Sequence, residues 1–198
     1  MPPLKEVQHY FIGLWLLVQR DPKGFQYLDI SERGVLRSFW AILWCFPATA
    51  ISWVWWRNAY LISVPKEPQS GPLFVLHLAM LEVANWVFPV VLIGVMCLVL
   101  GLGNRFLAIV VTSNWLAVPF SYIYGLIIAM VIFIPGSAAM ASLLWLGLML
   151  GLVFSLMRIF SMICGKQPLM IATLILVFVV PTMLLSDLLE QYLGVYLF

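Results

Sequence analysis

Charged side chains are scarce in this chain. Of its 198 residues, 9% are Asp, Glu, Lys or Arg and 64% are hydrophobic, whereas an ordinary soluble domain has about 25% charged and about 45–50% apolar residues. A water-soluble fold of this size would lack the polar side chains to cover its surface. Several apolar runs are long enough to cross a bilayer. We therefore expect an all-α fold, a polytopic membrane helix bundle.

The motifs of common catalytic classes are also missing. The sequence has no HExxH, no GxSxG, no Walker A loop, no CxxCH and no paired aspartates of an intramembrane protease, and no nucleophile stands beside a general base. Its two histidines and three cysteines show no metal-ligand spacing, and its net charge of +2 is too small to indicate a nucleic-acid partner. We expect a chain without enzymatic activity, cofactor or metal.

Prolines and glycines divide the apolar part of the chain into segments. Pro72 and Pro168 suit the first turn of a helix, and Gly101 and Gly165 suit helix ends. We expect a bundle over residues 31–198 with five spans, at about 35–56, 72–100, 105–134, 138–163 and 169–186 or beyond.

Residues 1–30 form a separate N-terminal segment. Apolar residues recur at helical spacing over 4–18, with polar residues away from that stripe. This amphipathic helix is too short to span, so we expect it to lie in the membrane interface. Docking of its apolar stripe on the chain's own helices is the alternative.

The positive charges predict an orientation. If the N terminus is cytoplasmic, eight Lys and Arg residues lie inside and two outside, which is a clear positive-inside bias. The C terminus, with Asp187 and Glu190 exposed at the surface, would lie on the opposite side of what we expect to be a bacterial inner membrane. The inner set is Lys5, Arg20, Lys23, Arg33, Arg37, Arg105, Arg158 and Lys166, and the outer set is Arg57 and Lys66.

Two predicted spans hold Asn-Trp followed closely by proline, in LEVANWVFPV (81–90) and VTSNWLAVPF (111–120). A proline inside a helix frees the carbonyl four residues back, and in lipid that carbonyl needs a partner. Asn85 and Asn114 either hydrogen-bond the broken turns and each other, or frame a polar cavity of the kind found in transporters. Helix kinks are expected at Pro47, Pro89, Pro119 and Pro181.

Glu82 is the one acidic residue that lies within a predicted span, and such a residue is a functional candidate. We expect it close to the outer interface, where it would pair with Arg57 or lie near His77; a proton or cation relay is the alternative. Glu82, His77, Asn85 and Asn114 together make up the candidate polar intramembrane site.

Gly147 and Gly151 form a GxxxG motif in the fourth predicted span. Small residues at this spacing let helix backbones approach closely in a membrane. The motif predicts helix packing, either within the chain or between two chains.

The layout resembles the Yip-type family of five-span membrane proteins, which includes bacterial members. The resemblance is carried by the N-terminal amphipathic segment, the five hydrophobic helices, the short outer tail and polar-aromatic segments such as SNWLAVPFSY (113–122). It implies an accessory or membrane-organising protein without chemistry of its own.

Two functions are therefore expected from the sequence. The first is a non-catalytic scaffold or accessory subunit, in a homo-oligomer or a larger membrane complex, with membrane lipids as further partners. The alternative is a small oligomeric transporter or channel with a polar site at the second and third spans.

Overall fold

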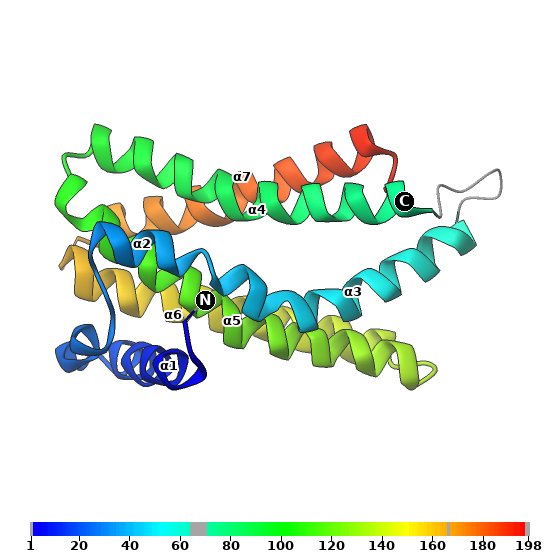
Figure 1. Cartoon of the computed structure of the whole chain (residues 1–198), viewed down its shortest axis with the longest axis horizontal. Helices are drawn as coiled ribbons and strands as arrows, with labels where there is room; N and C mark the ends of the chain where they lie inside the picture. Colours follow the sequence, from blue (N-terminus) through cyan, green and yellow to red (C-terminus); the bar gives the residue numbers. More distant parts are fainter. Residues whose placement is uncertain (1, 64–70, 166, 197–198) are drawn as a thin grey trace.

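A computed structural model describes residues 2–63, 71–165 and 167–196 (Figure 1). Within these ranges the chain is helical and has no strand, so the all-α prediction is confirmed, and five helices are long and apolar enough to cross a membrane. Lys66 and Lys166 lie outside the described residues. The elements are α1 (Leu4–Val18), the 3-10 helix η1 (Pro22–Tyr27), α2 (Glu32–Ser38), α3 (Ala41–Ser63), α4 (Pro72–Val99), α5 (Gly103–Phe133), α6 (Ala138–Cys164) and α7 (Pro168–Leu193).

The predicted first span is interrupted in the structure. Helix α2 ends at Ser38, and α3 begins again at Ala41. The Ser38 hydroxyl donates to the Val35 carbonyl at 2.7 Å and accepts from the Asn114 amide at 2.8 Å. The bond from a serine side chain to its own helix backbone competes with the regular backbone hydrogen bonds of the helix. The helix is therefore interrupted just after Ser38, whose hydroxyl also links α2 to α5.

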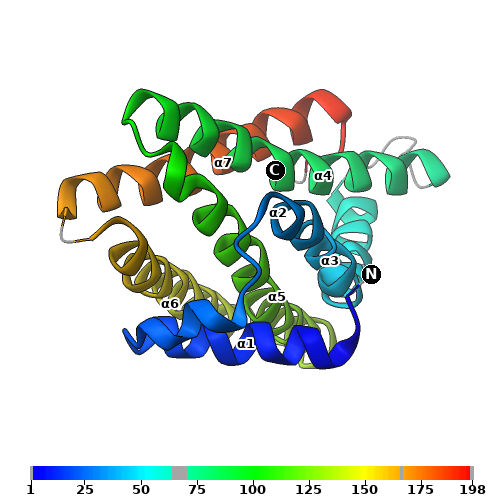
Figure 2. The same cartoon turned by 60° about the vertical axis from the view of Figure 1, so that its left-hand side comes forward.

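The long helices form two layers. Helices α4 and α7 pack along each other, and α3 and α6 both pack against α5 (Figures 1 and 2). The α4–α5 and α6–α7 turns lie at one end of the bundle, and the α5–α6 turn and the C terminus lie at the other (Figure 1). Pro47, Pro89, Pro119 and Pro181 all lie inside continuous helices.

Helix α1 packs on the protein itself. Tyr10, Leu14 and Leu17 are buried, and Figure 2 shows the helix lying across α5 and α6. The Arg158 guanidinium donates to the Val18 carbonyl at 2.8 Å, which holds the end of α1 on α6. The buried stripe therefore faces protein, as in the docking alternative, and the position of α1 in the membrane interface stays a prediction. Its exposed face carries Trp15.

A hydrogen-bonded group fixes the other end of α1. Tyr10 donates to Glu6, and Glu6 forms an ion pair with Arg37 of α2 at 2.7 Å. Burial, and then the hydrogen bond to Glu6, raise the pKa of Tyr10 above its ordinary value. Tyr10 therefore stays protonated and remains a donor throughout the physiological pH range.

The main hydrophobic core fills one half of the bundle. Its fully buried side chains include Ile109, Trp115, Phe160 and Leu174, which lie toward the α4–α5 and α6–α7 turns. Arg105 closes this end by donating to the Cys164 carbonyl at 2.6 Å. Arg37, Arg105 and Arg158 make their hydrogen bonds here, and Arg20 lines a groove at the same end. The orientation in the membrane stays a prediction.

A close approach between two of the long helices lies away from the predicted GxxxG motif. A Cβ atom added at Gly125 of α5 would lie 3.1 Å from Ala48 Cβ and 3.3 Å from the Ala48 carbonyl oxygen of α3. A Cβ at Gly147 would meet nothing within 4 Å, and one at Gly151 would meet only Phe120, at 3.7 Å. Within the chain, Gly147 therefore packs against no neighbouring helix among the described residues.

We predict that Gly125→Leu destabilises the protein, because the added side chain must push α3 away from α5. Overpacking of this kind costs about 1–3 kcal/mol, measured as a change in the free energy of unfolding in detergent. Gly147→Leu is the matched control and should remain close to the wild type. Equal losses for both variants would contradict the packing described here.

Candidate polar intramembrane site

Two adjoining cavities lie between the long helices. The smaller, with a volume of about 270 Å³, lies among α3, α4, α5 and α7, and the larger, of about 420 Å³, is lined by all five long helices. We call the two together the central cavity. Glu82 and Asn85 line both parts, and Asn114 lines the smaller. The residues that line both parts are Thr49, Glu82, Asn85, Ser113, Ala117, Ser121 and Phe178.

Glu82 lies near the middle of its helix. Helix α4 has 28 residues and begins at Pro72, so at a rise of 1.5 Å per residue Glu82 is about 5 Å from the helix midpoint. Ala117 of α5 and Thr182 of α7, which also line the cavity, are near the middle of their own helices. Helix α4 extends well beyond Glu82 on both sides, and the expected position near the outer interface stays a prediction.

Glu82 makes no ion pair with Arg57. Across the described residues, the one salt bridge joins Arg37 to Glu6. His77 does not line the central cavity, and its buried Nδ1 atom has no hydrogen-bond partner in the described part of the chain. The structure therefore brings Glu82, Asn85 and Asn114 to one cavity and leaves His77 outside it.

The two asparagines are bonded to different helices. Asn85 Oδ1 on α4 accepts from the Ser186 hydroxyl on α7 at 3.0 Å, and Asn114 Nδ2 on α5 donates to Ser38 on α2 at 2.8 Å. They bond neither each other nor the proline-broken turns. Each amide links two helices, as expected of a packing role, and also borders the cavity, as expected of a polar site.

Three hydroxyls that line the cavity donate to the backbones of their own helices. Ser113 donates to the Ile109 carbonyl at 2.7 Å, Ser121 to that of Val118 at 2.8 Å, and Thr182 to that of Phe178 at 2.8 Å. A hydroxyl that donates to its own helix still has oxygen lone pairs free to accept. Together with the Glu82 carboxyl, these oxygens make a lining rich in acceptors.

Glu190 also lines the central cavity, although the sequence placed it with Asp187 at the outer surface. The structure turns Glu190 inward and leaves Asp187 exposed. Ser186 and Glu190 are four residues apart, so they share a helix face. The cavity thus extends from the middle of the bundle toward the end of α7 that is nearest the C terminus.

Sequence reasoning missed the hydroxyl residues of this site. These hydroxyl residues belong to stripes of cavity-lining residues at helical spacing. The stripes are Ser113, Ala117 and Ser121 on α5, and Thr182, Ser186 and Glu190 on α7. Such stripes are a readable signal, because residues three and four apart line one face of a helix. A search for polar stripes on the predicted spans would have found them.

The floor of the cavity is packed. Trp115, next to Asn114, is fully buried, and its ring packs at a tilt on the ring of Tyr10 of α1, with the ring centroids 4.7 Å apart. This pair belongs to the main core, and Trp115 lines neither part of the central cavity.

Comparison with protein-family models, with curated proteins and with solved structures found no match. The chemistry of the cavity must therefore be argued from its own atoms. Carboxyl and hydroxyl oxygens can bind a cation or accept a proton from a ligand. In the described ranges, no three His, Cys, Asp or Glu side chains gather as a metal-binding group.

We predict an energetic coupling between Asn114 and Ser38. In a double-mutant cycle with Asn114→Leu and Ser38→Ala, the coupling should be about 0.6 kcal/mol, the average for hydrogen bonds between membrane helices, and at most about 1.7 kcal/mol. Asn104→Leu, an exposed asparagine on the same helix, is the control and should show no coupling to Ser38. Strictly additive effects of Asn114→Leu and Ser38→Ala would show that the bond does not form.

Proposed function

We propose that this integral membrane protein is a small carrier or channel subunit whose central cavity binds a small cationic solute. The single observation that supports this proposal is the position of Glu82. Its carboxyl lies near the middle of a membrane-spanning helix, lines a cavity, and has no ion pair with a protein cation in the described part of the chain.

The cost of placing a carboxyl at this depth favours a functional reading. A charged side chain at the bilayer centre costs several kcal/mol unless water, a proton or a counter-ion accompanies it. A purely structural glutamate would be expected to have a basic partner. Glu82 instead faces an open volume, so a solute cation or a proton is the natural partner.

The lining also supports a preference for cations. The hydroxyls of Ser113, Ser121 and Thr182 offer acceptor oxygens, while their protons are bonded to the helix backbone. Glu190 adds a second carboxyl toward the end of α7. Such a lining suits ammonium, guanidinium or a short polyamine better than an anion.

We further infer an arrangement in the membrane from the two unlike halves of the bundle. The packed half, with the contacts of Arg20, Arg37, Arg105 and Arg158, would face the cytoplasm of a bacterial cell, and the hollow half would face the opposite side. Transport would require the packed half to open in turn. Because five spans are few for a transporter, we expect a homo-oligomer.

We predict that Glu82→Gln weakens solute binding. Ammonium, guanidinium and putrescine would be tested for thermal stabilisation of the purified protein and for uptake into proteoliposomes. The wild type should respond to at least one of them, and Glu82→Gln should lower that affinity about tenfold or more, since a hydrogen bond to a charged group contributes about 1.5–3 kcal/mol. Asp187→Asn removes an exposed carboxylate outside the cavity and should behave as the wild type.

Two results of this experiment would contradict the carrier proposal. One is equal affinity of the wild type and Glu82→Gln for the same cation, which would place the binding site elsewhere. The other is the absence of any response in the wild type together with a fixed protein partner that co-purifies with it.

The second of these results would support a scaffold or accessory subunit, which is our second candidate. Two observations favour it: both Asn85 and Asn114 are satisfied by protein groups, and Gly147 lies on a helix face without a neighbour. A membrane-organising role is also what the Yip-type resemblance implies, and that resemblance stays a prediction.

A further inference from the structure

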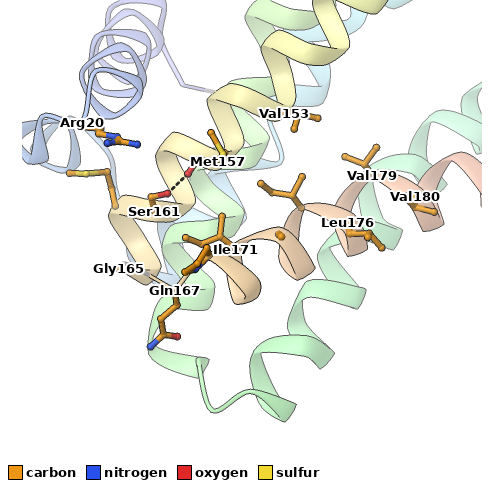
Figure 3. Close-up of a pocket in the computed structure, with 14 residues that line it drawn as sticks. Arg20, Val153, Met157, Ser161, Gly165, Gln167, Ile171, Leu176, Val179 and Val180 are labelled. Carbon is orange, nitrogen blue, oxygen red and sulfur yellow. Dashed lines mark hydrogen bonds between the residues drawn. The ribbon is translucent and has the colours of Figure 1, made fainter.

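A large groove lies between α6 and α7, outside the central cavity. Its volume is about 730 Å³, and its walls are mainly apolar, with Val153 and Met157 on α6 and Ile171, Leu176 and Val180 on α7 (Figure 3). It lies at the packed end of the bundle, where α6 ends and α7 begins. Neither Glu82 nor any other acidic residue lines it.

The groove has the length of one membrane leaflet. Along α7 its lining runs from Pro168 to Val180, which at 1.5 Å per residue is about 18 Å. Half of the hydrocarbon core of a bilayer is about 15 Å. The groove therefore extends from the interface region at the start of α7 to about the middle of the membrane, as an acyl chain does.

Arg20 lies at the interface end of this groove (Figure 3). It follows α1 and has a φ of 68°, which is unusual for a residue with a side chain. The conformation is held because Arg20 N donates to the Leu17 carbonyl at 2.9 Å and Asp21 N donates to that of Leu16 at 2.8 Å. The bond from Arg158 to Val18 then fastens this segment to α6.

The Arg20 side chain is exposed and forms no ion pair among the residues that the structure describes. An arginine at this position places a positive charge directly beside an apolar groove, at the end where we expect the lipid phosphates. Its guanidinium can bind two phosphate oxygens at once. The charge and the groove together match the two parts of an anionic lipid.

We propose that the groove between α6 and α7 binds one acyl chain of an anionic phospholipid, with the lipid phosphate on Arg20. This site is separate from the central cavity and does not depend on the proposed transport. It would hold the end of α1, the end of α6 and the start of α7 together through one lipid molecule.

The test is native mass spectrometry of the detergent-purified full chain, titrated with phosphatidylglycerol or with phosphatidylcholine of the same acyl chains. The wild type should bind phosphatidylglycerol about fivefold more tightly, as one basic residue near the membrane surface contributes about 1 kcal/mol. Arg20→Asn should remove that preference while folding normally, since asparagine tolerates a positive φ. Arg20→Lys should retain most of it.

Two further variants separate the charge from the groove. Arg33→Asn, an exposed arginine on α2 outside the groove, should keep the wild-type preference. Ala172→Phe, which fills the groove from α7, should weaken binding of both lipids. If Ala172→Phe does not elute as a folded particle, Val180→Phe is used in its place.

Three results would overturn the proposal. They are an unchanged lipid preference in Arg20→Asn, an equal loss in Arg33→Asn, and effective competition by free glycerol phosphate. The last would show that the site takes a soluble phosphate and has no need of the acyl chain. Binding of phosphatidylglycerol that withstands free glycerol phosphate supports the lipid as the occupant.

Discussion

The structure depends on one constraint, which is that a polar group inside a membrane needs a partner other than bulk water. Most polar side chains meet it simply. The hydroxyls of Ser113 and Thr182 donate to their own helices, and the amides of Asn85 and Asn114 each bond a serine of another helix. Glu82 is different, because it faces the central cavity and forms no ion pair within the described ranges. The proposed function follows from that difference.

The two halves of the bundle differ in their packing. The half that contains Trp115 and the docked helix α1 is packed with large apolar side chains and closed by arginines that bond helix-end carbonyls. The other half is hollow, and its mainly apolar lining includes acceptor oxygens along α5 and α7. Under the proposed function, the packed half would keep the membrane sealed while a solute reaches Glu82. The groove at Arg20 belongs to the packed half, where a bound lipid would strengthen the same seal.

Much of the fold follows from local sequence signals. Helix ends are marked in the sequence by proline and glycine, because the backbones of these residues favour or prevent particular conformations. The residues are Pro72, Gly101, Gly165 and Pro168, and the helix ends lie within a few residues of the predicted ones. Contacts between distant residues were not predictable in this way. Asn114 and Ser38 are 76 positions apart, and Ser186 and Asn85 are 101 apart. An amphipathic pattern in α1 indicates that one face is covered, and only tertiary packing decides whether lipid or protein covers it.

The proposed function requires water in the central cavity at Glu82, and cysteine accessibility tests this requirement most directly. Cys45, Cys97 and Cys164 would be replaced by alanine, and Ser121→Cys on the cavity wall compared with Ile123→Cys, which is 47% exposed on the outer face of the same helix. A membrane-impermeant thiol reagent needs water and a thiolate. Added on the side of the C terminus, it should modify Ser121→Cys and leave Ile123→Cys unmodified. An unreactive Ser121→Cys would show a dry, packed interior and contradict the account.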